Sequence, residues 1–183
     1  MSTAEDYYPV AMAISPDTKD WTWVLNEPCA ECGFNAGEFP AEEVGQRVRD
    51  DLPRWQAVLA KPDAGVRPNA AIWSATEYAC HVRDVCDLFA ERLDMILTQD
   101  DPLFANWDQD VTAIEKDYTS QLAPAVSAEL TPAFTAAAAA FDAVRADAWE
   151  RPGRRSNGSV FTARTLSQYF LHDLVHHLYD IDG

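Results

Sequence analysis

The chain has 183 residues, of which 48% are hydrophobic and 24% are charged, and this balance predicts a single ordered globular domain rather than a disordered chain. Its 30 acidic and 14 basic residues leave a net charge of −16, which disfavours nucleic acid and anionic membranes as partners. The N-terminus lacks the positive charge and apolar run of a secretory signal, and no apolar stretch is long enough to span a bilayer. A cytoplasmic location is therefore expected.

Residues 1–37 are predicted to form an irregular N-terminal extension, followed by one helical domain over residues 38–183. Within the extension, Trp21 and Trp23 indicate a short strand or an aromatic cover over another part of the fold. The segment from Cys29 to Gly33 reads Cys-x-x-Cys-Gly, which has the form of a zinc knuckle. We favour a tight turn with half-buried thiols, because no second knuckle exists and the βαβ context of a redox pair is missing. A second metal site that combines Cys29, Cys32 and one of the histidines is the other interpretation.

The first helix is predicted from Pro40 onward, since proline suits the first helical position and Glu42 and Glu43 follow in the first turn. Pro53 is expected to kink this helix or to split it in two.

The second helix carries the clearest local signals. Ser74 and Glu77 form a capping box, Ser-x-x-Glu, and apolar residues then recur with helical period from Tyr78 to Ile96. His81 lies within this helix, one position away from its apolar stripe. Cys80 and Cys86, also in this helix, are expected to be small core residues.

The rest of the chain predicts two more helices and no strand hairpins. Residues 100–117 form a long acidic connection, which can cross the bundle. A third helix is predicted over residues 120–148, with Pro132 at the start of its regular part, and the loop over residues 151–158 ends it. The fourth helix is predicted over residues 162–179. The sequence thus indicates an all-α fold, a four-helix bundle.

The histidines suggest a metal site. His172 and His176 are four residues apart on one helix and can bind one ion, and His81 is the remaining histidine that can supply a third ligand from another helix. His177 follows His176 directly and points about 100° away from it, so we assign it a supporting or core role, with replacement of one of the other two ligands as the alternative. Three histidines with an open position are typical of a catalytic zinc site.

The layout resembles the DinB-like (DinB/YfiT) superfamily of bacterial metal-binding four-helix bundles over roughly residues 38–181. The resemblance depends on His81 within the segment from Trp73 to Asp84 and on the pair His172-x-x-x-His176 in the last helix. The Cys-x-x-Cys-Gly segment further suggests an actinobacterial subgroup.

This resemblance implies an up-down-down-up bundle, with the long connection as its crossover between helices 2 and 3. It also implies a divalent metal on His81, His172 and His176. Characterised members are S-transferases that use bacillithiol or mycothiol, a related branch is the mycothiol-dependent maleylpyruvate isomerase, and others are described as metal-dependent hydrolases. Homodimers are common in the family.

The leading hypothesis from the sequence is a metal-dependent thiol S-transferase. A divalent ion, zinc or alternatively nickel or iron, would bind a low-molecular-weight thiol as thiolate for attack on a small electrophile. Arg154 and Arg155 would hold the anionic groups of the thiol cofactor.

Two alternatives remain open. A hydrolase would use a water activated by the metal, with Asp84, Glu77 or His177 as the base. A non-catalytic metal-binding or stress-related bundle would close the coordination shell with a fourth protein ligand such as Cys80 or a carboxylate.

Overall fold

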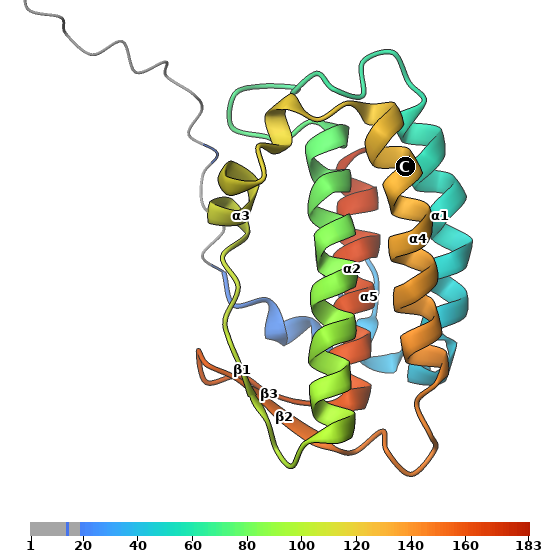
Figure 1. Ribbon diagram of the computed structural model, residues 1–183, viewed down its shortest axis with the longest axis vertical. Helices are drawn as coiled ribbons and strands as arrows, with labels where there is room; N and C mark the ends of the chain where they lie inside the picture. Colours follow the sequence, from blue (N-terminus) through green and yellow to red (C-terminus); the bar gives the residue numbers. More distant parts are fainter. Residues whose placement is uncertain (1–13, 15–18) are drawn as a thin grey trace, which may run out of the picture.

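The computed structural model describes Ile14 and residues 19–183 (Figure 1). Four long helices form a bundle, to which short 3-10 helices and three short strands are attached. The elements in chain order are η1 (Trp21–Leu25), η2 (Ala36–Glu38), η3 (Ala41–Glu43), α1 (Val44–Leu59), α2 (Ala75–Thr98), β1 (Leu103–Phe104), α3 (Gln109–Glu115), η4 (Tyr118–Ser120), α4 (Ala123–Asp142), β2 (Pro152–Arg155), β3 (Val160–Thr162) and α5 (Ala163–Asp180).

The helices have the predicted up-down-down-up arrangement. In Figure 1, α1 and α5 run upward and α2 and α4 run downward. Helix α4 packs against α1 and α2, and α2 also packs against α5. Because α2 and α4 are parallel, residues 99–122 must return the chain along the length of the bundle, and this crossover contains β1, α3 and η4. The predicted four-helix bundle is confirmed.

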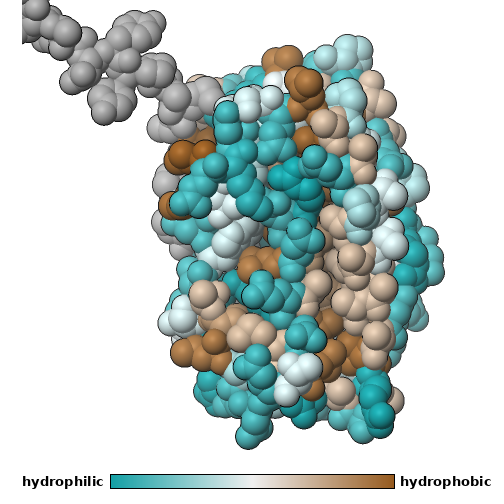
Figure 2. All heavy atoms as spheres, in the orientation of Figure 1, coloured by the Kyte–Doolittle hydropathy of each residue, from teal (hydrophilic) through white to brown (hydrophobic). Residues whose placement is uncertain are grey.

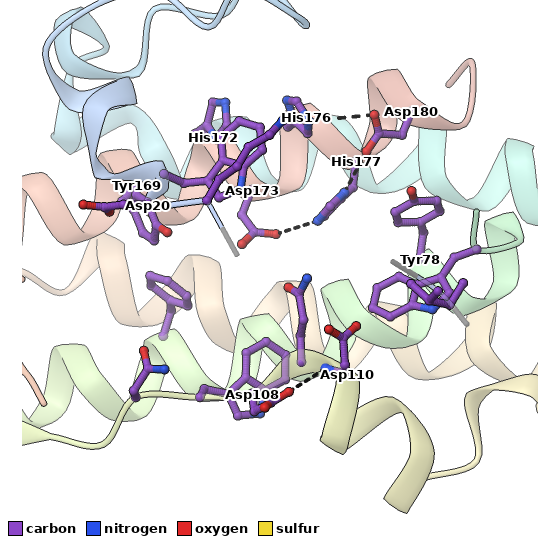
Figure 3. Close-up of a pocket in the computed structure, with 18 of the residues that line it drawn as sticks. Asp20, Tyr78, Asp108, Asp110, Tyr169, His172, Asp173, His176, His177 and Asp180 are labelled. Atoms are coloured by element: carbon purple, nitrogen blue, oxygen red, sulfur yellow. Dashed lines mark hydrogen bonds and ion pairs between the residues drawn. The ribbon is translucent and has the colours of Figure 1, made fainter. Parts of the chain in front are cut away.

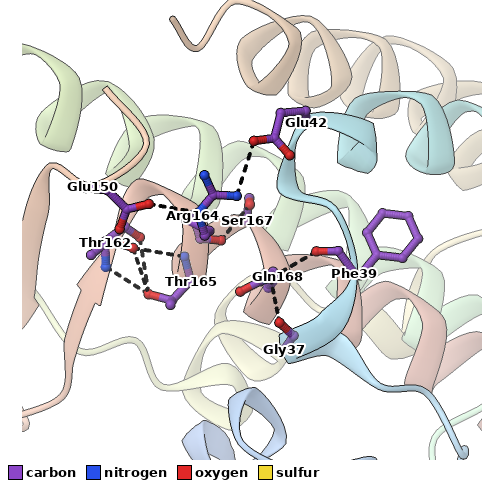
Figure 4. A network of polar contacts seen from close by, with 9 residues as sticks. All are labelled: Gly37, Phe39, Glu42, Glu150, Thr162, Arg164, Thr165, Ser167 and Gln168. Carbon is purple, nitrogen blue, oxygen red and sulfur yellow. Dashed lines mark hydrogen bonds and ion pairs between the residues drawn. The ribbon is translucent and has the colours of Figure 1, made fainter. Parts of the chain in front are cut away.

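The capping box predicted for α2 is present, and α5 begins with a second one that was not predicted. Ser74 Oγ accepts a hydrogen bond from the backbone N–H of Glu77, and the Glu77 carboxylate accepts one from the backbone N–H of Ser74. Thr162 and Thr165 form the equivalent box at the start of α5 (Figure 4). These boxes pair backbone N–H groups that a helix start leaves unsatisfied, and so fix where the two site-bearing helices begin.

Both internal prolines lie within continuous helices, so α1 is not split at Pro53, one of the two predicted outcomes there, and the prediction that the regular part of α4 begins at Pro132 is wrong. Val48 and Trp55, which precede and follow Pro53 in α1, are fully buried, and burial of such side chains offsets the one hydrogen bond that proline removes. Helix α4 ends at Asp142, six residues before the predicted end.

A three-stranded sheet closes one end of the bundle, where the sequence predicted a loop without strands. Strand β2 pairs in parallel with β1 and antiparallel with β3. A Cβ atom at Gly153 would lie 2.5 Å from Cγ1 of Ile96, so glycine lets β2 approach the end of α2 closely. These strands are too short for an alternating pattern to reveal them.

The core lies between the four long helices. Phe170 of α5 is completely buried, and its ring stacks on Phe141 of α4 at 4.9 Å and contacts Phe89 of α2 at 5.4 Å. The face shown in Figure 2 is largely hydrophilic, with a light-brown, weakly hydrophobic stripe in the region of α4. On this helix Ala125, Ala128 and Ala136 are exposed. In the part of the chain that the structure describes, no helix is long and apolar enough to cross a membrane.

Candidate metal centre

Helix α5 carries two pairs of potential metal ligands on adjacent faces. His172 and His176 form one pair and Asp173 and His177 form the other, each with a spacing of four residues. His172 and His176 face residues 19–39, which we call the N-terminal segment. The ring centre of Trp21 lies 5.7 Å from that of His172 and 4.9 Å from that of His176. Asp173 and His177 point toward one another (Figure 3) and face α2. The rotation of α5 about its axis therefore decides which pair meets His81.

Asp173 and His177 meet His81. Oδ1 of Asp173 lies 3.2 Å from Nε2 of His81 and 3.3 Å from Nε2 of His177. One donor atom from each residue lies within 4.8 Å of the others. We call these three residues the α2–α5 cluster.

The protonation states of His81 and Asp173 suit a cation. Burial lowers the pKa of His81 below its usual value, which favours the neutral imidazole with a free lone pair. Burial acts to raise the pKa of Asp173, but the hydrogen bond with His81 and the nearby histidines outweigh it and lower that pKa to about 2. Imidazole nitrogens and a carboxylate oxygen are the donor types that zinc, iron and nickel accept.

Surrounding side chains orient the two histidine rings of this cluster. Nδ1 of His177 donates a hydrogen bond of 2.9 Å to Oδ2 of Asp180, which directs Nε2 toward Asp173. The His81 ring stacks on Trp107 at 5.3 Å and contacts Trp73 at 5.6 Å. Among the described residues, the buried Nδ1 of His81 has no hydrogen-bond partner. Burial of an unpaired nitrogen costs free energy. The fold bears this cost at His81, the residue whose Nε2 meets the other donors.

The other pair on α5 belongs to a second group of donors. Sγ of Cys29 lies 3.6 Å from Nδ1 of His176, and Sγ of Cys32 lies 3.9 Å from Nε2 of His172. All four donor atoms lie within 4.8 Å of one another. Burial lowers the pKa of His172 to about 4 and also lowers that of His176, so both rings favour the neutral form. We call these four residues the Cys–His cluster.

A cavity of about 630 Å³ borders both clusters. The N-terminal segment, α2, the crossover, the hairpin of β2 and β3, and α5 all contribute to its wall (Figure 3). Its lining includes aromatic rings such as Trp107, the cations Arg92 and Arg155, and several carboxylates. This size and this mixture of apolar and polar groups fit a small-molecule site.

The structure does not bring the three predicted histidine ligands together. His81 falls in the α2–α5 cluster, whereas His172 and His176 fall in the Cys–His cluster. The 100° turn between adjacent residues does separate His177 from His176, as predicted, but it places His177 rather than His176 beside His81. Asp173 is absent from the predicted ligand set, although Asp173-x-x-x-His177 repeats the spacing that pointed to His172 and His176.

The two carboxylates proposed as bases are engaged elsewhere. Asp84 accepts a hydrogen bond from the Tyr118 hydroxyl and forms ion pairs with Lys116 at 3.0 Å and Arg83 at 3.1 Å, which holds the crossover against α2. Burial acts to raise the pKa of Asp84, but these partners outweigh it and lower that pKa. Glu77 closes the capping box of α2, which is one of its two predicted roles, and it also forms an ion pair with Arg67.

The two arginines proposed to hold a cofactor differ in position. Arg155 lines the cavity, where its guanidinium donates to Asn157 and Ser159. Arg154 is about half exposed and forms an ion pair of 2.7 Å with Asp101. Of the two, Arg155 is therefore the one placed to meet a bound molecule.

Comparisons of sequence and of structure with known proteins agree with one another. The sequence model of the DinB superfamily matches residues 45–181. Among solved structures, the chain is similar to YfiT from Bacillus subtilis, described as a probable metal-dependent hydrolase with an unusual four-helix bundle topology. The two share 14% sequence identity and superpose with a TM-score of 0.64, over 94% of this chain and 95% of YfiT. Comparison with curated proteins gave no match.

Proposed function

The chain belongs to the DinB superfamily, and from this membership and its donor geometry we propose that it is a metal-dependent hydrolase of small molecules. The observation that carries the proposal is the convergence of Nε2 of His81, Oδ1 of Asp173 and Nε2 of His177 beside a cavity. YfiT, which shares the fold, is described as a probable hydrolase of this kind. The proposal places the metal on a different ligand set from the three histidines predicted from sequence.

The spacing of the donors fits a metal ion. Bonds of about 2.1 Å in tetrahedral geometry place two nitrogen or oxygen ligands roughly 3.4 Å apart. The distances from Oδ1 of Asp173 to the two histidine nitrogens are 3.2 and 3.3 Å. Three protein ligands leave one position for water or substrate, which is the pattern of catalytic rather than structural zinc sites.

A divalent ion at this centre would polarise a substrate carbonyl and make water more acidic, which is the chemistry that ester or amide hydrolysis needs. The protein side chains have separate tasks. Asp180 holds the Nδ1 proton of His177 and so keeps Nε2 directed at the centre. Trp107 and Trp73 cover the His81 ring and keep bulk water away from it. Asp173 supplies the negative charge that offsets the cation.

The cavity indicates the substrate class. Its volume of about 630 Å³ suits a drug-sized or smaller molecule rather than a protein chain. Arg92 and Arg155 on its wall can pair with an anionic group, and the aromatic side chains can cover an apolar one. A small ester or amide with an acidic group is the class that these features favour.

Thiol S-transfer would use the same centre, so the experiment must distinguish this reaction from hydrolysis. Metal-free protein is reloaded with zinc, manganese, nickel or iron(II) and assayed against a panel of small esters and amides. Parallel samples contain mycothiol or bacillithiol with a model electrophile. We expect turnover that needs metal and does not need thiol. Asp173→Asn should abolish this turnover, whereas Asp182→Asn, a matched change beyond the end of α5, should leave it intact.

Two results would overturn the proposal. One is the absence of metal-dependent turnover without thiol, with adduct formation in the thiol samples, which would favour the S-transferase. The other is full activity in folded Asp173→Asn protein, which would place the chemistry elsewhere.

A further inference from the structure

The Cys–His cluster has no part in the proposed hydrolysis, yet it brings four strong ligands into one place. Cys29 is buried, and His172 and His176 are 4% and 7% exposed. Soft thiolates combined with imidazoles are the ligand set that selects zinc over magnesium or calcium. We propose that Cys29, Cys32, His172 and His176 bind a second, structural zinc ion that fastens the N-terminal segment to α5.

The distances between the donor atoms fit a tetrahedral ion. Zinc bonds of about 2.3 Å to sulfur and about 2.0 Å to nitrogen place sulfur and nitrogen roughly 3.5 Å apart. The two sulfur–nitrogen distances are 3.6 Å for Cys29 and His176, and 3.9 Å for Cys32 and His172. Since all four ligands come from the protein, no position remains for substrate, and the site is of the closed, structural type.

The backbone of the cysteine segment is folded as a knuckle. The N–H of Gly33 donates to the carbonyl of Cys29 at 2.8 Å, and Cys29 in turn donates to the carbonyl of Phe34 at 2.9 Å. Gly33 has a φ of +74°, a conformation that glycine adopts without strain. This turn directs both sulfurs toward α5, where the spacing of four residues sets the two imidazoles side by side, with ring centres 5.1 Å apart.

Neighbouring groups support the ligands as they do in zinc sites. Nδ1 of His176 faces Cys29, and its Nε2 lies 3.7 Å from a carboxylate oxygen of Glu31 and 3.8 Å from one of Asp180. Carboxylates beside the second ring nitrogen orient a ligand histidine and increase its basicity. Trp21 covers both imidazoles and shields the cluster from one side.

The position of the cluster explains what the ion would do. The ligands are separated by 140 and 147 residues in sequence, so the ion would join the start of the described chain to its last helix. Gln168 already contributes to this junction by donating to the carbonyls of Gly37 and Phe39 (Figure 4). Lys19, Trp21 and Glu31 belong to the cavity wall. The ion would therefore hold one wall of the cavity in place.

Cobalt(II) substitution of the full-length protein under reducing conditions tests this proposal directly. We expect a thiolate-to-cobalt charge-transfer band together with the ligand-field bands of a tetrahedral ion. Cys29→Ala/Cys32→Ala should lose the charge-transfer band and about one equivalent of metal. Cys80→Ala/Cys86→Ala, which changes the two core cysteines instead, should keep both. Hydrogen exchange in residues 21–36 should become at least about tenfold faster in the first variant.

The absence of a thiolate band in the wild-type protein, or its persistence in folded Cys29→Ala/Cys32→Ala, would overturn the proposal. A Cys29–Cys32 disulfide in protein purified under reducing conditions would do the same. If the double variant fails to fold, X-ray absorption of the zinc-loaded wild type decides, because it must show sulfur at about 2.3 Å from zinc. The proposal is independent of the hydrolase: Asp173→Asn should remove the other ion and leave the thiolate band unchanged.

Discussion

Replacement of Asp180 by asparagine tests whether His177 is a metal ligand held by a neighbouring carboxylate. The hydrogen bond from Nδ1 of His177 to Oδ2 of Asp180 is 2.9 Å long, and the two side chains are 17% and 24% exposed. A hydrogen bond to a charged group in such a half-buried position contributes about 1.5 to 3 kcal/mol. If all of it serves to orient His177, Asp180→Asn should weaken metal binding at the α2–α5 cluster about 10- to 100-fold.

The assay titrates apo-protein with zinc in competition with a chelating dye. Because Asp180 also approaches His176 at 3.8 Å, both variants are made in the Cys29→Ala/Cys32→Ala background, where the α2–α5 cluster remains intact. Asp182→Asn is the matched control, since it removes the same charge two residues further on. Equal zinc affinities in the Asp180 and Asp182 variants would refute the reasoning, because Asp180 would then not position a ligand.

Three further predictions concern the fold and the cavity. Burial acts to raise the pKa of Glu77, but its contacts with Arg67 and Ser74 outweigh this and lower that pKa. The ionised carboxylate therefore stabilises the fold above pH 4.5, and this stabilisation is lost as the pH falls through the folded-state pKa. Glu77→Gln should therefore reduce the drop in unfolding free energy of metal-free protein between pH 7 and pH 3, and an unchanged drop would contradict this. Phe170→Ala should lower the free energy of unfolding in denaturant by about 3 to 5 kcal/mol because the ring is fully buried; a loss of about 1 kcal/mol would contradict the packing. Arg155→Ala should lower kcat/KM for an anionic ester about tenfold, whereas the ion-paired Arg154→Ala should change it less than about twofold, and equal losses would show that the cavity wall is not involved.

Local signals in the sequence predict the helices that carry the site. The capping box of Ser74 and Glu77 fixes the start of α2, and α5 begins at Ala163, next to the predicted start at Thr162. Capping contacts join residues only three positions apart, so the spacing in the sequence predicts them directly. The bundle follows from these helices and their apolar stripes.

The division of the histidines between two clusters could not be predicted from local spacing in the sequence. His172 and His176 have the same spacing as Asp173 and His177, and a rotation of α5 by about 100° would exchange the pair that faces His81. That rotation is set by packing of the whole bundle, including buried residues such as Phe170 and Leu174. Spacing alone therefore predicts a pair of ligands but not its partner.

The contact between the N-terminal segment and α5 depends on interactions that are distant in sequence. Cys29 and Cys32 meet histidines about 140 residues further on, and the intervening chain contains the whole bundle. The Cys-x-x-Cys knuckle and the His-x-x-x-His pair are each recognisable as half of a zinc site. Their association requires the path of residues 19–39 over α5, which no local pattern specifies.

The zinc content of two single-histidine variants tests the central assignment most directly. In the Cys29→Ala/Cys32→Ala background, His172→Ala should retain about one equivalent of zinc per chain, because the α2–α5 cluster is intact. His177→Ala in the same background should retain none. Loss of zinc in the His172 variant together with retention in the His177 variant would contradict the account and restore a centre built from His81, His172 and His176.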